Sequence, residues 1–123
     1  MPRYVILEHD LPSLHWDLML ESGDVLRTWR LSEPPQPARK VAATSAFDHR
    51  RMYLDYEGPV RGNRGRVVRW DHGTFAWQEI LSNRLAVDMN GARLCGILLV
   101  EQTSGDHWML SYAPRVTPVH KGH

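Results

Sequence analysis

Residues 9–21 read H-D-L-P-S-L-H-W-D-L-M-L-E, and this stretch combines a strand pattern with residue types that bind metals. One set of alternate positions holds Trp16, Leu18 and Leu20, and the other holds His15, Asp17, Met19 and Glu21. A period of two is typical of a β-strand with one face turned to the core. We therefore expect the tryptophan and leucines to face the core. The histidine and aspartate then stand side by side on the opposite face, where they must be solvated, paired or bound to a ligand.

Further strands are predicted wherever runs rich in Val, Ile and aromatic residues are bounded by turn signals. The predicted strands are residues 3–8, 14–21, 25–31, 41–47, 65–71, 74–80, 85–89, 93–100 and 107–113. His72-Gly73 and Asn90-Gly91 are predicted hairpin turns, and residues 75–83 are the best place for a short helix. The pattern predicts an all-β fold, a compact single-domain β-barrel of short antiparallel strands with little helix. We expect this domain to span residues 1–113 and a flexible C-terminal tail to span residues 114–123.

Composition narrows the functional classes. The 123 residues are enough for one domain, and the formal net charge of +1 argues against a generally basic nucleic-acid-binding surface. A local basic patch is still possible, because six arginines lie between residues 50 and 69. They could bind a nucleic-acid backbone, or they could be a solvated loop and strand edge. The single cysteine, Cys95, is expected to be buried; it excludes an internal disulfide and indicates a cytoplasmic location. We find no apolar run that would span a membrane, and we expect a monomer.

Two groups of residues are candidates for chemistry. His9, His15 and Asp17 offer two imidazoles and a carboxylate, a set that suits Mn²⁺, Zn²⁺, Fe²⁺ or Co²⁺ and leaves positions open for substrate. The alternative is a surface histidine paired with an aspartate across a strand. His49 and Tyr53, in a predicted loop, can bind phosphate or deliver a proton to a leaving oxygen. The alternative for them is a loop histidine beside a packing tyrosine.

Taken in order, these segments resemble the 3′-phosphoesterase domain of bacterial DNA ligase D and its stand-alone relatives. The motifs that carry the resemblance are E-H at 8–9, L-H-W-D-L-M-L-E at 14–21, V-L-R-T-W at 25–29, D-H at 48–49, Tyr53, D-Y-E-G at 55–58, V-V-R-W-D-H-G-T at 67–74, G-x-x-L-x-G at 91–96 and W-x-L at 108–110. The resemblance implies a β-barrel with a metal site in a groove. It also implies a hydrolase of DNA repair that removes a 3′-phosphate or a 3′-terminal ribonucleoside from DNA or RNA ends. A separately encoded DNA ligase and polymerase would be its partners.

The resemblance also implies roles for particular residues. It makes His9, His15 and Asp17 the ligands of Mn²⁺. It makes His49 the group that contacts the scissile phosphate and protonates the leaving oxygen, and Tyr53 a second phosphate contact.

Three positions depart from the family pattern. Met19 stands where the family has an arginine, Phe47 where it has a glutamate, and Glu33 where it has a lysine. Methionine offers neither charge nor hydrogen-bond donors. If the turn at residues 22–24 has two central residues, Arg30 shares the face of Asp17, so we predict that Arg30 binds the phosphate instead, with Arg51 as a second candidate. The alternative function is a module that binds nucleic-acid ends or phosphate with weak or no catalysis.

Overall fold

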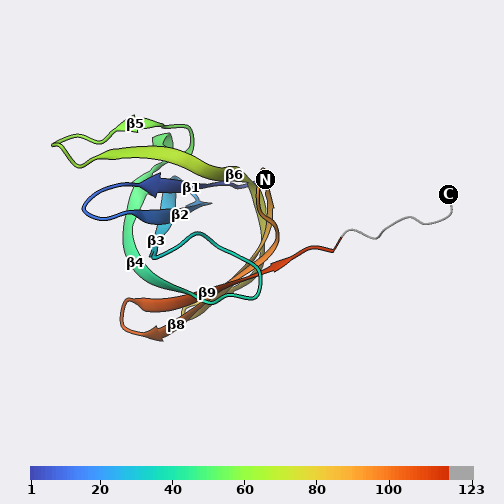
Figure 1. Cartoon of the computed structure of the whole chain (residues 1–123). Coiled ribbons are helices and arrows are strands. Elements are labelled where there is room, and N and C mark those ends of the chain that lie inside the picture. Colours follow the sequence, from blue (N-terminus) through green and yellow to red (C-terminus); the bar gives the residue numbers. More distant parts are fainter. Residues whose placement is uncertain (117–123) are drawn as a thin grey trace.

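The computed structural model describes residues 1–116, whose strands form one continuous sheet (Figure 1). The elements are β1 (Arg3–His9), β2 (His15–Ser22), β3 (Val25–Leu31), β4 (Val41–Arg50), the 3₁₀ helix η1 (Arg51–Leu54), β5 (Gly58–Pro59), β6 (Arg66–Leu81), β7 (Arg84–Gly91), β8 (Cys95–Ser104) and β9 (His107–Pro114). The sheet order is β1-β2-β3-β4-β9-β8-β7-β6, and β6 pairs back onto β1 to close an antiparallel barrel of eight strands. The predicted all-β barrel is confirmed. Within the described part of the chain, no helix is long and apolar enough to cross a bilayer.

The main core fills the inside of this barrel. Its buried side chains come from all eight barrel strands, and Leu18 and Leu20 are among them, as the alternation in β2 predicted. Trp16 is only half-buried and packs against the edge of the same core. Of the predicted tail, Pro114 ends β9, and residues 117–123 lie outside the described residues.

A second, smaller core lies on the outer face of the barrel wall. It is built from Val5, Leu7, Met19, Leu26, Leu54 and Val67. Several of these alternate along β1 and β2 with residues of the main core, so they point to the opposite side of the same strands. Leu54 belongs to η1, and Tyr53, Tyr56 and Val60 pack against this second core. The face of β2 that carries the histidine and aspartate is therefore covered next to the candidate site.

The predicted hairpin at His72-Gly73 is wrong, because β6 runs through it without turning. The first half of β6 pairs with β1 and the second half with β7. Gly73 lies opposite Gly91, and a Cβ atom on Gly73 would come within 2.3 Å of the Asn90 carbonyl oxygen. The glycine thus marks a close approach of two strands. The helix expected at residues 75–83 is also wrong, since most of that segment belongs to β6.

The burial expected for Cys95 is wrong as well. Cys95 begins β8 next to the β7–β8 turn, where its side chain is exposed and its Sγ donates to the Gly91 carbonyl oxygen at 3.5 Å. The apolar run that follows it alternates between buried and half-buried positions from Gly96 to Val100. The interior face of β8 therefore begins one residue later than Cys95.

Candidate metal centre

His9 and His15 face each other across the end of the β1–β2 hairpin. They are register partners, and their ring centroids lie 4.8 Å apart. Asp17 follows two residues along β2, on the same face as His15. One ligand atom from each of the three residues lies within 4.8 Å of the others. The structure thus brings together the three residues that the sequence singled out, and it buries His15 and Asp17, which are 4% and 6% exposed.

Backbone carbonyl groups determine which ring nitrogen of each histidine is free. His15 Nδ1 lies 2.7 Å from the Ser13 carbonyl oxygen, and His9 Nε2 lies 2.6 Å from the Arg64 carbonyl oxygen. Because a carbonyl oxygen only accepts, each of these nitrogens must carry a hydrogen and donate it. His15 Nε2 and His9 Nδ1 are left with their lone pairs free in the neutral rings. In metal-binding histidines, the ring nitrogen that does not bind the metal typically donates such a hydrogen bond, which orients the ring.

The two free nitrogens and the aspartate converge on one point. His15 Nε2 lies 3.4 Å and His9 Nδ1 lies 3.9 Å from Asp17 Oδ2. His15 Nε2 is buried and has no hydrogen-bond partner. Lone pairs that face a carboxylate oxygen repel it unless a proton or a metal ion lies between them. Two donors on one divalent ion, each about 2.1 Å from it, are roughly 3.0–3.4 Å apart, so these residues fit such an ion after a small contraction.

An open cavity of about 700 Å³ adjoins this cluster. Its polar lining includes His9, Asp17, Arg30, His49, Tyr53 and Arg64, and its apolar lining includes Leu11, Pro12, Phe47 and Val60. The loop before β6 forms one wall. There, a Cβ on Gly65 would lie 2.2 Å from Asp10 Oδ1, so only glycine lets this loop dock against the β1–β2 hairpin. The same docking places the Arg64 carbonyl oxygen on His9.

His49 reaches the cavity because β4 contains a bulge. Leu26 of β3 pairs with His49 and Thr28 pairs with Ala46, so Phe47 and Asp48 together oppose one residue of β3. The His49 Nδ1 atom lies 2.8 Å from the Phe47 carbonyl oxygen, to which it donates, and 3.0 Å from Thr28 Oγ1. Nε2 is therefore the ring nitrogen that remains available to a substrate.

Tyr53 lies next to His49 in the same cavity. The two rings pack edge to face with centroids 5.6 Å apart, and Tyr56 packs on the other side of Tyr53 at 5.9 Å. Tyr53 belongs to η1, so the segment expected to be an irregular loop instead forms a short 3₁₀ helix that follows β4 directly. The structure thus brings His49 and Tyr53 together with the metal-ligand cluster.

The two candidate arginines differ in position. The β2–β3 turn has two central residues and pairs Asp17 with Arg30, whose Nε lies 3.8 Å from Asp17 Oδ1 in the cavity wall. Arg51 is not among the described residues that line the cavity. Its Nε donates to Glu21 Oε2 at 2.9 Å. The pKa of Glu21 is lowered, first by a hydrogen bond from the Arg3 backbone N–H and then by Arg51. Arg51 is thus engaged by Glu21, while Arg30 faces the site.

A second cavity, of about 490 Å³, begins on the other side of the cluster. Arg30 lines both cavities, whereas Asp17 lines the first and His15 lines the second. The second cavity continues over β4 and β9, past Thr44 and His107. The candidate metal-ligand cluster therefore contributes to the lining of both cavities, and Arg30 is common to the two.

Sequence reasoning did not single out three residues that help to build this site. Ser13 and Thr28 orient His15 and His49 through hydrogen bonds. Arg64 contributes its carbonyl oxygen to His9 and is among the residues that line the cavity. The signal for Arg64 was the G-N-R-G turn at residues 62–65, which was noted only as part of an arginine-rich segment.

The fold and the cluster define a small β-barrel protein with a candidate divalent-metal centre beside an arginine-containing cavity. The family model described as "DNA Ligase D 3′-phosphoesterase domain" matches residues 7–101, and the chain belongs to this family.

The chain is also similar to bacterial proteins named LigD. The multifunctional non-homologous end joining protein LigD of Pseudomonas aeruginosa is 33% identical over 106 residues, which is 76% of this chain and 12% of that protein. Its counterpart from Mycobacterium bovis is 28% identical over 115 residues, 86% of this chain and 15% of that protein. The one from Mycolicibacterium smegmatis is 29% identical over 123 residues. This chain therefore spans less than a fifth of the length of these relatives.

Proposed function

We propose that this chain is a metal-dependent phosphoesterase that processes 3′ ends of nucleic acids in DNA repair, removing a 3′-phosphate or a 3′-terminal ribonucleoside. The observation that carries the proposal is the buried Nε2 of His15, which has no partner and points its lone pair at Asp17 beside an open cavity. Membership of the ligase D 3′-phosphoesterase family supports the choice of reaction.

We propose Mn²⁺ as the ion, held by His9, His15 and Asp17; Zn²⁺ and Co²⁺ suit the same donors. When bound, the ion supplies positive charge that polarises a phosphoryl oxygen. Neighbouring backbone groups orient the ligands. The carbonyl oxygens of Ser13 and Arg64 hold the rings of His15 and His9 so that each turns a free nitrogen toward Asp17. Arg30 and Arg64, in the cavity wall, are the cationic groups available to a phosphate.

His49 is the proposed general acid. Its Nδ1–H is fixed by the Phe47 carbonyl group, so the imidazolium form would hold its second proton at Nε2, ready for a leaving oxygen. Tyr53 keeps the His49 ring in place through their edge-to-face contact and is a hydroxyl donor for the same phosphate. A general acid of this kind typically contributes about 10²–10⁴-fold to the rate.

One observation favours the alternative of a module that binds ends without turnover. Met19, at the position of the family arginine, is only 1% exposed and belongs to the outer apolar core, so it offers nothing to a phosphate. The proposal therefore depends on Arg30, across the strand pair, to supply the missing charge. We further propose that a separately encoded DNA ligase and polymerase act on the ends that this protein produces.

The test is to incubate the protein and Mn²⁺ with labelled primer–templates that end in a 3′-phosphate or in one 3′-ribonucleotide. His15→Ala removes the partnerless nitrogen, and His72→Ala, an exposed histidine on β6 away from both cavities, is the matched control. We expect release of phosphate or nucleoside by the wild type and by His72→Ala, and none by His15→Ala. Binding without release in the presence of Mn²⁺, Zn²⁺ and Co²⁺ would instead identify a binding module.

A further inference from the structure

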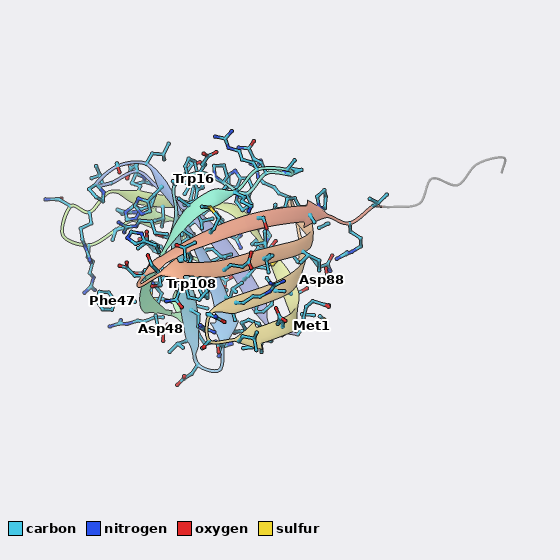
Figure 2. The ribbon with its side chains drawn as sticks, turned by 90° about the horizontal axis from the view of Figure 1, so that it is seen from below. Met1, Trp16, Phe47, Asp48, Asp88 and Trp108 are labelled. Atoms are coloured by element: carbon cyan, nitrogen blue, oxygen red, sulfur yellow. The ribbon has the colours of Figure 1, made fainter. Side chains whose placement is uncertain are left out.

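Phe47 is an aromatic side chain in an unusual position. Its side chain is 91% exposed, and every other aromatic residue in the described part of the chain is buried or half-buried. Exposing a phenylalanine forgoes the favourable free energy of burying its ring. Figure 2 shows Phe47 and Asp48 at one edge of the molecule, away from Asp88 at the opposite edge. Phe47 lines the same cavity as His49 and Tyr53.

The backbone of Phe47 is fixed relative to the candidate chemistry. Its carbonyl oxygen accepts the hydrogen bond from His49 Nδ1 at 2.8 Å, and the β-bulge turns this part of β4 toward the cavity. The backbone from which the exposed ring projects is therefore held beside His49, the proposed general acid. A leaving group whose oxygen takes its proton from His49 would lie in the cavity that Phe47 also lines.

A phosphodiester carries one nucleoside on each side of its phosphorus, and there is one cavity on each side of Arg30. A bare phosphate is far smaller than the first cavity of about 700 Å³, which has an apolar wall formed by Leu11, Pro12 and Val60. A sugar with its base needs such a wall, since the face of a base stacks on aromatic and apolar side chains. The second cavity, beyond Arg30, then leaves room for the strand on the other side of the phosphate.

We infer that the first cavity holds the 3′-terminal nucleoside that is removed and that Phe47 stacks on its base. This inference rests on the proposed function. It adds that Phe47 favours ends with a terminal nucleoside over ends with only a 3′-phosphate. Stacking of this kind is sequence-tolerant, because every base has a π-face. Phe47 is thus a binding residue for any base at the terminus.

The experiment is a double-mutant cycle between protein and substrate. Primer–templates carry at the primer 3′ end either a 2-aminopurine ribonucleotide or an abasic ribose, and binding is followed by 2-aminopurine quenching and by competition with the abasic primer. Both are measured with Mn²⁺ on rapid mixing and again in EDTA. Wild type is compared with Phe47→Ala, Phe47→Trp and Leu81→Ala; Leu81 is an exposed apolar residue at the far end of β6.

We expect Phe47→Ala to bind the base-bearing end about tenfold more weakly and to lose most of the quenching. Phe47→Trp should restore both, Leu81→Ala should behave as wild type, and none of the three should change binding of the abasic end. Equal losses on both ends, no loss with Phe47→Ala, or no quenching by wild type under either condition would overturn the inference. Quenching that depends on Phe47 without any turnover would leave the inference standing while the proposed function fails. Removal of the ribonucleoside at the wild-type rate and with wild-type binding by Phe47→Ala would overturn the inference and leave the proposed function standing.

Discussion

Replacing Arg30 tests whether this chain has recovered the charge that Met19 cannot supply. Arg30→Gln keeps a polar side chain with hydrogen-bond donors, although a shorter one, and removes the positive charge of the guanidinium, whose Nε lies 3.8 Å from Asp17 Oδ1. A hydrogen bond between charged groups contributes about 1.5–3 kcal/mol. The Arg30 side chain is 50% exposed, so solvent screening favours the lower half of that range. A loss of about 1.5–2 kcal/mol corresponds to a fall in kcat/KM of roughly 10- to 30-fold.

The assay is phosphate release from a primer with a 3′-phosphate at saturating Mn²⁺. Stability should change by less than about 1 kcal/mol, because half-exposed ion pairs contribute little. Arg39→Gln is the control, since Arg39 is an exposed arginine that donates to Glu33 away from both cavities. Full activity of Arg30→Gln, or an equal loss in Arg39→Gln, would refute the role of Arg30.

Three further predictions concern the metal, the core and pH. Mn²⁺ at 100 times its Kd should stabilise the wild type by about 2.7 kcal/mol, a Tm rise of roughly 10 °C, and should leave His15→Ala unshifted in a thermal melt. Tyr4→Phe should lower the free energy of unfolding in urea by about 1–3 kcal/mol, because the Tyr4 hydroxyl donates to the buried Asp71 carboxylate at 2.6 Å; an unchanged midpoint would contradict this. The lowered pKa of Glu21 means that its contribution is complete above the ordinary value of about 4.3 and is lost as pH falls through the folded-state pKa. The stability difference between wild type and Glu21→Gln should therefore narrow as pH falls below about 5, and a difference independent of pH would refute it.

The alternation in β2 carried most of what the sequence could predict. A period of two places His15 and Asp17 on one face and the leucines on the other, and a two-residue turn then places Arg30 opposite Asp17. These are local rules, so they hold without knowledge of the rest of the fold. The same rules could not show that the face with His15 is covered, because its cover comes from η1 and the segment around β5, far along the chain.

The remaining features depend on contacts between distant segments. The bulge at Phe47-Asp48 turns His49 toward the cavity. The sequence has no glycine, proline or asparagine there that would predict a bulge. Gly73 resembles a turn residue in the sequence, yet it is required by the approach of Gly91. In the sequence, Arg51 and Arg64 cannot be told apart in role, because both are arginines of the same arginine-rich segment. Only the folded loops show that Arg51 meets Glu21 and that Arg64 joins the cavity.

The most direct test of the account compares Mn²⁺ binding with catalysis in one titration. Bound Mn²⁺ is counted by electron paramagnetic resonance while phosphate release from a 3′-phosphate primer is followed at the same metal concentrations. We expect one ion per chain, half-maximal binding and half-maximal activity at the same Mn²⁺ concentration, and the loss of both in His15→Ala. Activity that persists in EDTA or in His15→Ala would contradict it, as would one bound ion with no phosphate released.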